Sequence, residues 1–299
     1  MIFSLLATII LWGGNNTGIK YIVGYWPPIW TGCSRFLLAG LILMGLLHGT
    51  NWFGPVRSLT PAVTKALWWR TSFSLAAYIV VFNWALTFTS ASHVALYLGA
   101  SPVWALLMES PPNRTWQSLQ RYLAAGLAMI GVIVLFLPTL KLNQVHWVGE
   151  LLGMACGFLW AFHGRQCHQI GGDLTGVEIT AHTMWRAGLW LTPLALIEVI
   201  IRGGIPWHPG VVAVQGYCIL FGGVAAFVLW NNSLRVWSAS KCFLFNNLIP
   251  LSTMAWAHAC LKEPVTPTYF IAMTFIIAGV VLSQSSWIKL LGTRWMPEE

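Results

Sequence analysis

The chain has 299 residues, of which 57% are hydrophobic and only 8% are charged, and its formal net charge is +8. Soluble domains typically carry about 25% charged residues, so this composition excludes an ordinary soluble domain and indicates an integral membrane protein. The basic residues stand singly between apolar runs, which excludes the clustered basic patch typical of nucleic-acid binding.

A helix that crosses a membrane needs about 20 mostly apolar residues, and the sequence contains ten such segments. The first five are Phe3–Val23, Pro28–Leu47, Trp68–Phe88, Ser92–Met108 and Arg121–Leu137. The next five are Trp147–His168, Val177–Ile201, Ala213–Trp237, Lys241–Leu261 and Thr268–Ile288. The first segment lacks a basic leader and a cleavage site, so we interpret it as a membrane helix rather than a removable signal peptide. We therefore predict an all-α, multi-pass membrane protein with ten transmembrane helices.

The distribution of Lys and Arg predicts how these helices are oriented, because cytoplasmic loops carry an excess of both. With the N-terminus placed inside, ten of these residues fall on the cytoplasmic side. Four fall on the outer side, namely Lys20, Lys141, Arg202 and Lys262. This bias predicts a protein of the cell inner membrane with its N- and C-termini in the cytoplasm.

The two halves of the chain are related by a shift of 148 positions. Under this shift identical residues align: Trp12 with Trp160, Asn83 with Asn231, and Pro102 with Pro250. Arg35 falls on Arg186 only with a shift of 151. We divide the chain into repeats of residues 1–140 and 141–299. Because each repeat has five helices, an odd number, the second enters the membrane from the opposite side. Such inverted repeats are common in secondary transporters, which expose one central site to either side alternately.

Two prolines, Pro102 and Pro250, fall inside the fourth and ninth predicted helices. A proline removes a backbone hydrogen bond and kinks a helix, which a membrane tolerates where neighbours or a cavity satisfy the freed carbonyl. Their matched positions predict paired hinges beside a substrate path, and static packing kinks are the alternative.

Polar and aromatic side chains at membrane depth are the candidates for substrate binding. Lipid cannot satisfy the amides of the membrane asparagines, so these should face the bundle interior, where they bind substrate or join helices. Aromatic rings could line the same cavity, with ordinary packing as the alternative for each. The predicted substrate-binding set is Trp12, Asn15, Tyr78, Asn83, Tyr97, Trp160, His163, Trp230, Asn231 and Phe245.

Few charged residues lie within the apolar runs. Arg35 and Arg186 could attract a carboxylate or phosphate, or could anchor helix ends. We favour anchoring, because each lies close to a helix start. Glu109 and Glu178 are identified as the only acids near the membrane core, both close to cytoplasmic ends. His163 is the predicted proton-handling residue, with a polar contact between helices as the alternative.

The remaining motifs point to packing rather than chemistry. Gly149, Gly153 and Gly157 form a tandem G-x-x-x-G, which predicts close helix packing within the chain or in a homodimer. The sequence has no P-loop, no G-x-S-x-G and no H-E-x-x-H motif, and none of its six cysteines forms a C-x-x-C pair. We predict no catalytic residue, no metal site and no cofactor.

At this point the residues resemble a known family. The run Trp12-Gly13-Gly14-Asn15, followed by Lys20, Pro27-Pro28 and Arg35-Phe36-Leu37-Leu38-Ala39-Gly40, resembles the opening of EamA-type members of the drug/metabolite transporter superfamily. Asn83 through Ala91 with Pro102-Val103, and the second-half copy ending in Pro250, resemble a further signature. The resemblance covers nearly the whole chain.

This resemblance implies ten helices in two inverted repeats, cytoplasmic termini and a central cavity lined by helices one, three, four, six, eight and nine. On those helices it places Trp12, Asn15, Tyr78, Tyr97, Trp160, Trp230 and Phe245. The second half has Ala161-Phe162-His163 where the first has Gly13-Gly14-Asn15, so the two half-sites are chemically unequal.

We therefore predict a secondary transporter that moves small metabolites, exporting amino acids or related compounds, across the inner membrane by alternating access. Its partners would be the small-molecule substrate and the lipid bilayer, with no nucleic acid. One alternative is a polytopic membrane enzyme, which would need clustered polar catalysts at an interface. Another is a non-transporting scaffold or a channel, and a channel would show a continuous polar stripe or charged ring.

Overall fold

Every element that the structure describes is a helix. This computed structural model describes residues 2–101, 104, 108, 116–136, 144–170, 174–236 and 248–284. The first half contributes α1 (Ile2–Ile22), α2 (Pro28–Gly49), α3 (Pro61–Ala66), the π-helix η1 (Leu67–Ser72), α4 (Phe73–Phe88), α5 (Ala91–Gly99) and α7 (Trp116–Phe136). The second half contributes α8 (Gln144–Ile170), α9 (Gly176–Ile201), α10 (Pro209–Tyr217), the π-helix η3 (Cys218–Ala225), α11 (Ala226–Val236), α13 (Ile249–Leu261) and α14 (Pro267–Gln284). The prediction of an all-α protein is confirmed.

Within the part of the chain that the structure describes, five stretches of helix are long and apolar enough to cross a membrane, as expected of a multi-pass membrane protein. They are Ile2–Ile22, Pro28–Gly49, Pro61–Phe88, Gly176–Ile201 and Pro209–Trp230. Two shorter apolar helical segments are Tyr122–Leu135 and Pro267–Gly279. Each of the ten predicted segments overlaps a described helix, but ten crossings in two inverted repeats stay a prediction.

Side-chain caps and prolines set where several helices begin. Ser90 accepts a hydrogen bond from the His93 backbone N–H at the start of α5. Thr175 and Glu178 form a complete capping box at the start of α9, in which each side chain accepts a backbone N–H. Glu178 also accepts the Arg57 N–H at 2.7 Å. One of the two acids that the sequence suggested for the membrane core therefore serves as a helix cap.

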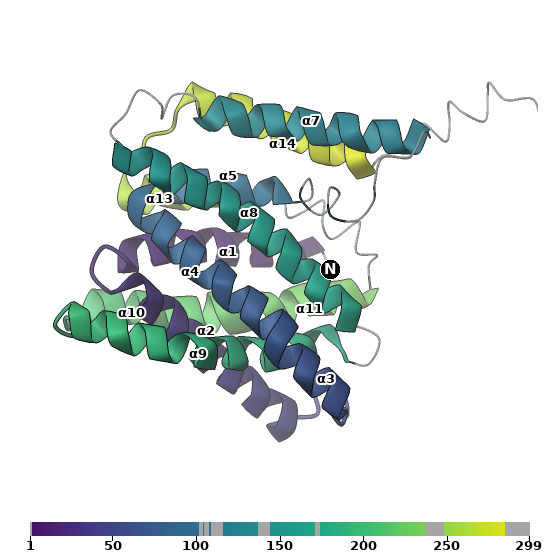
Figure 1. The fold of residues 1–299 in the computed structure, drawn as a ribbon, viewed down its shortest axis with the longest axis vertical. Helices are drawn as coiled ribbons and strands as arrows, with labels where there is room; N and C mark the ends of the chain where they lie inside the picture. The colour runs from purple at the N-terminus through teal and green to yellow at the C-terminus, as the bar shows by residue number, and fades with distance from the viewer. Residues whose placement is uncertain are drawn as a thin grey trace, which may run out of the picture.

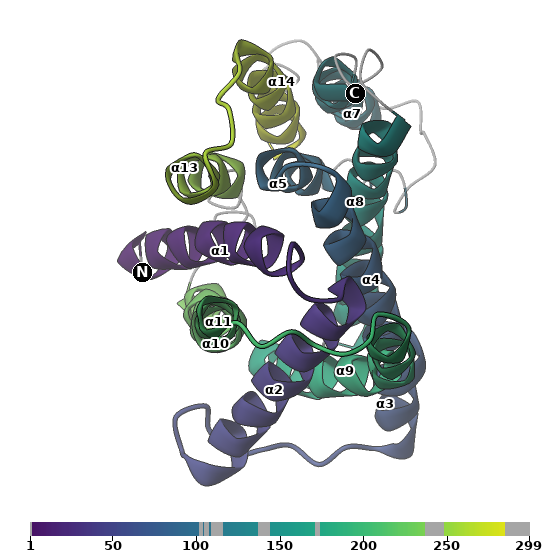
Figure 2. The same ribbon diagram turned by 90° about the vertical axis from the view of Figure 1, so that its left-hand side faces the viewer.

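The helices pack in pairs that join the two halves of the chain. Figures 1 and 2 show α7 and α14 side by side at one end of the long axis, with α5 and α13 next to them. Towards the other end α2 packs along α9, and α4 packs along α8. Helix α1 passes between α13 on one side and α10 with α11 on the other (Figure 2). Each of these pairs combines a helix from residues 1–140 with one from residues 141–299.

The α2–α9 pair is held together by two glycine contacts that mirror each other. A Cβ on Gly40 would lie 2.9 Å from the Cα of Trp185, and a Cβ on Gly188 would lie 2.7 Å from the Cα of Leu37. Gly40 and Gly188 are 148 positions apart, and so are Leu37 and Trp185. The same contact is therefore made twice, with the roles of the two halves exchanged.

The α7–α14 pair repeats this arrangement. A Cβ on Gly131 would lie 2.6 Å from the carbonyl oxygen of Ala272, and a Cβ on Gly279 would lie 2.5 Å from that of Ala124. Both glycines and both alanines are again 148 positions apart. Glycine is needed at these points because the backbones of neighbouring membrane helices approach closely.

Candidate functional site

Asn15 and Arg35 form a buried polar pair at the junction of α1, α2 and η3. The Arg35 guanidinium donates from Nη1 to Oδ1 of Asn15 at 2.9 Å, and each residue is only 6% exposed. The guanidinium also lies 4.3 Å from the ring centroid of Phe36. Gly222 of η3 makes room for the amide, since a Cβ there would lie 2.8 Å from Cβ and Cγ of Asn15.

One group of aromatic rings lies next to this pair, where α1 meets η3 and α11. Trp12, one turn before Asn15, donates its indole N–H to the carbonyl oxygen of Gly222 at 3.2 Å. Its ring lies 5.2 Å from that of Phe227 and 5.5 Å from that of Trp230. π-Helical turns such as η3 occur mostly as short insertions in α-helices and frequently at functional sites.

A second aromatic group connects α4 to α8. The ring of Tyr78 lies 5.1 Å from that of Trp160 and 5.5 Å from that of Phe82, and Tyr78 belongs to the same hydrophobic core as Phe36. His163 lies 5.8 Å from Trp160, centroid to centroid. The structure thus brings together a set of buried and half-buried residues that we call the central cluster. It consists of Trp12, Asn15, Arg35, Tyr78, Trp160, His163 and Trp230.

One part of the central cluster has a counterpart in the other half of the chain. Asn15 and His163 are 148 positions apart, as are Gly222 and Ser74. Asn15 packs against Gly222, and His163 is hydrogen-bonded through Nδ1 to the Ser74 hydroxyl at 3.0 Å. The second half-site has therefore replaced an amide packed on glycine with an imidazole bonded to serine.

Two predicted substrate-binding residues have other partners. Asn83 donates to the carbonyl oxygen of Pro28 at 2.7 Å and so ties α4 to the start of α2. Tyr97 is packed under the glycines of α8, since Cβ atoms on Gly153 and Gly157 would collide with its ring and its carbonyl oxygen. The tandem glycines that the sequence suggested therefore pack within the chain.

The remaining predictions are only partly described. Pro250 lies in the first turn of α13, where a proline breaks no intrahelical hydrogen bond, and its carbonyl oxygen accepts the Tyr269 hydroxyl at 2.6 Å. Its hinge role stays a prediction. Pro102, Phe245 and the side chain of Asn231 lie outside the described residues. A proline inside a helix occurs instead at Pro193 of α9.

The sequence reasoning missed a buried carboxylate, Glu150 of α8, which is only 2% exposed. It accepts hydrogen bonds from the Thr89 hydroxyl, from His93 Nδ1 at 2.7 Å and from the Tyr97 hydroxyl at 2.5 Å. We call these four residues the Glu150 network. Lys20 lies beside it, donating to the carbonyl oxygen of Thr89 at 2.7 Å. A count of acids inside the predicted helix Trp147–His168 would have found Glu150.

Arg186, the second buried arginine, has a different environment from Arg35. Its guanidinium lies 4.2 Å from the ring centroid of Trp185 and 5.5 Å from that of Trp68, and it donates to the carbonyl oxygen of His182 in its own helix at 3.0 Å. The glycine contacts fix a shift of 148, which pairs Arg35 with Thr183 rather than Arg186. The shift of 151 had suggested that Arg35 and Arg186 are equivalent positions of the two halves, and the glycine contacts show that they are not.

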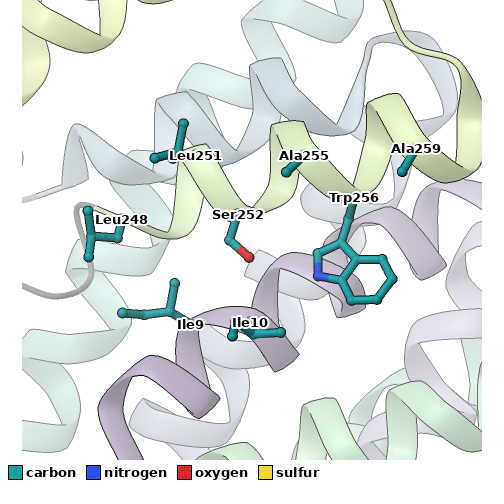
Figure 3. Close-up of a pocket in the computed structure, with 8 residues that line it drawn as sticks. All are labelled: Ile9, Ile10, Leu248, Leu251, Ser252, Ala255, Trp256 and Ala259. Carbon is teal, nitrogen blue, oxygen red and sulfur yellow. The ribbon is translucent and has the colours of Figure 1, made fainter. Parts of the chain in front are cut away.

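Two pockets open on the described surface. A groove of about 420 Å³ lies between α1 and α13, and Figure 3 shows the residues that line it. Its lining is almost entirely apolar and consists of Ile9, Ile10, Leu248, Leu251, Ser252, Ala255, Trp256 and Ala259. A second pocket, of about 670 Å³, is lined in part by Arg70, Gln166, Gln169 and Ser74. It borders the central cluster, because Ser74 is the hydrogen-bond partner of His163.

Comparisons with known proteins agree with this architecture. The model of the EamA-like transporter family matches the chain twice, over residues 1–137 and 147–284. A Bacillus subtilis (strain 168) transporter, YyaM, is 25% identical over 292 residues, covering 96% of this chain and 93% of its own. A "probable amino-acid metabolite efflux pump" of Escherichia coli (strain K12) is 22% identical over 298 residues, covering 97% and 94%. A protein of known crystal structure, 15% identical, aligns with a TM-score of 0.62 over 99% of this chain and 98% of its own, and so shares the fold.

Proposed function

The chain belongs to the EamA-like transporter family, and from this premise we propose that it exports small metabolites across the inner membrane by alternating access. The proposed solutes are amino acids or related compounds. A bacterial relative that covers 97% of this chain carries the name of an amino-acid metabolite efflux pump, which supports this choice of solute and direction. Family and relatives alike indicate a transporter rather than an enzyme.

The proposed architecture is ten transmembrane helices in two inverted repeats, residues 1–140 and 141–299, with both termini in the cytoplasm. Two matches to one family model, one in each half, support the repeat. The mirrored glycine contacts of α2 with α9 and of α7 with α14 support it further, because a two-fold axis makes each contact occur twice. The excess of Lys and Arg on one side supports the orientation.

The observation that carries the proposed function is the central cluster. Charged and amide groups are costly in lipid and face the interior of a bundle, where they mark solute paths. Arg35 lies about 10 Å along α2 from Pro28, and Asn15 about 20 Å along α1 from Ile2. Because α1 and α2 enter from opposite sides, both depths correspond to one level inside a hydrocarbon core of about 30 Å. The rings of Trp12, Tyr78 and Trp160 offer apolar contact at that level.

Alternating access also needs elements that move. We propose Pro102 and Pro250 as a matched pair of hinges in the fourth and ninth helices. Cβ of Gly99, if present, would lie 3.2 Å from the Pro250 ring, so the start of α13 rests directly on α5. A movement of α5 would therefore displace the start of α13, and a movement of α13 would displace α5.

Uptake into proteoliposomes tests the proposed function. The full chain would be reconstituted and offered a panel of labelled amino acids, with and without an imposed pH gradient. We expect saturable uptake of one class of solute, which Trp12→Ala abolishes and the control Trp84→Ala retains, since Trp84 stacks on Phe88 away from the central cluster. Stimulation by the gradient would indicate proton exchange, and no effect would indicate facilitated diffusion. Absence of uptake by folded, inserted protein for every amino acid would refute the proposed solute class.

A further inference from the structure

Arg35 carries a buried positive charge that no acidic side chain of the described chain neutralises. Among the described residues the ion pairs are His93 with Glu150 and Arg202 with Glu198, and neither includes Arg35. A guanidinium has five N–H donors, of which the structure uses one for Asn15. Its Nε is buried and has no hydrogen-bond partner, as is also true of the Nε of Arg186, so the two arginines differ in the partners of their other nitrogens and in their aromatic neighbours. A charge in this environment is costly unless it meets an anion.

Arg186 shows how a buried arginine of this protein is held when it serves as an anchor. Two tryptophan rings lie within cation–π distance of its guanidinium, and a carbonyl oxygen of its own helix accepts its Nη1. These interactions partly replace the lost hydration of a cation. Arg35 has one phenylalanine ring and one amide oxygen, and both its partners come from α1 and α2, which reach the centre of the bundle.

We propose that Arg35, oriented by Asn15, binds the carboxylate group of the transported solute, and that the aromatic rings on either side hold an apolar part of that solute. This inference rests on the proposed function and adds the chemical class of substrate, an apolar monocarboxylate related to an amino acid. Arginine suits this role because its planar fork of donors matches a carboxylate in two parallel hydrogen bonds.

The surroundings of Arg35 favour one negative charge and an apolar body. The central cluster contains a single arginine and no acid, so a monoanion completes its charge balance. The Phe36 ring lies against the Arg35 guanidinium, and Trp12 lies one turn before Asn15 on the η3 side. Because Arg35 and Asn15 are themselves buried, a solute reaches Arg35 only when the helices part, as alternating access requires.

A pair of probes that differ only in the charged group tests this inference. Binding of 3-phenylpropionate and of 3-phenylpropanamide to the purified full chain in detergent would be followed by the quenching of tryptophan fluorescence, since three tryptophans belong to the cluster. We expect wild type to bind the acid at least about tenfold more tightly than the amide, because a hydrogen bond to a charged group is the larger contribution.

Three variants test whether the preference for the acid over the amide depends on Arg35. In Arg35→Gln the affinity ratio of acid to amide should fall to about one, with the amide bound as in wild type. Arg35→Lys should keep most of the ratio, because it keeps the charge. The matched control, Arg186→Gln, removes an equally buried arginine outside the cluster and should keep the wild-type ratio. Melting curves check that each variant is folded.

Several results would overturn the inference. The first is a wild-type protein that binds the amide as tightly as the acid, which needs no variant at all. Others are an unchanged ratio in Arg35→Gln and an equal loss in Arg186→Gln. Failure of both probes to bind wild type would also reject the substrate class. The proposed function fails separately, when uptake of every solute in the proteoliposome panel is absent, so the two results can be told apart.

Discussion

The contact between Gly131 and α14 offers a direct test of how the two halves fit together. Replacement of Gly131 by alanine puts a Cβ 2.6 Å from the carbonyl oxygen of Ala272, about 1 Å closer than the ordinary contact distance of about 3.5 Å. The obstacle is backbone, so no side chain can turn away and α7 must move from α14. Overpacking of this kind costs about 1 to 3 kcal/mol, and we expect Gly131→Ala to lower the free energy of unfolding by that amount.

The mirrored contact makes the prediction stricter. Gly279→Ala should destabilise the protein to a similar extent, because its Cβ would lie 2.5 Å from the Ala124 carbonyl oxygen in the same helix pair. In the double variant the free energy of unfolding should fall by less than the sum of the two single losses. Helices that one methyl group has already separated accept the second methyl group more easily. Gly126→Ala is the matched control on α7, because a Cβ there meets nothing within 4 Å.

The free energy of unfolding of the three single variants and the double variant would be measured by thermal and denaturant unfolding in detergent, with wild type as the reference. The reasoning is refuted if Gly131→Ala unfolds like Gly126→Ala, because the close approach of α7 and α14 would then be absent. Strict additivity of Gly131→Ala and Gly279→Ala would argue against one shared interface.

Three further predictions concern the remaining contacts. Glu150→Gln should lower the free energy of unfolding by about 2 to 4 kcal/mol, because one amide oxygen cannot serve the three donors of the Glu150 network; an unchanged melting curve would contradict this. Asn83→Leu should cost about 0.5 to 1.5 kcal/mol by removing the hydrogen bond that its side chain donates to the Pro28 carbonyl, and a changed solute preference would instead make Asn83 a binding residue. Trp12→Phe keeps a ring but loses the hydrogen bond to Gly222, so uptake should fall about fivefold at a nearly unchanged melting temperature. Uptake at the wild-type rate would remove Trp12 from the site.

The helical class could be predicted from the sequence because lipid leaves an unbroken apolar helix as the simplest way to satisfy the backbone. Identical residues in the two halves indicate the internal shift of 148. The glycine contacts between α2 and α9 follow that shift as well, although Arg35 and Arg186 had suggested 151 for this pair of helices. An alignment of single identical residues cannot separate a shift of 148 from one of 151, because the two differ by nearly one helical turn. Only the contact partners of Gly40 and Gly188 decide between them.

The candidate site was predicted in part for a similar reason. Residue type and depth are visible in a sequence, so the rings and amides that meet in the central cluster could be named. The partners of a side chain on another helix are not visible, and Asn83 and Tyr97 turned out to be tied to Pro28 and Glu150. Glu150 itself was overlooked because its value as a buried acid depends on donors from α4 and α5, about 60 residues away in the chain.

The mirrored glycines have a consequence for how such a protein could arise. Contacts that occur twice with exchanged roles are those of an isologous dimer, so each half behaves as one subunit of a fused pair. In a dimer of identical subunits, every charge near the axis would be duplicated, and a lone guanidinium could not exist. A single chain with two related halves is free of that constraint: the position that corresponds to Arg35 in the second half is Thr183, and the one that corresponds to Asn15 is His163. A single chain can therefore place one unpaired charge near the axis and so form a site suited to a small ion of the opposite charge. A dimer of two identical subunits cannot.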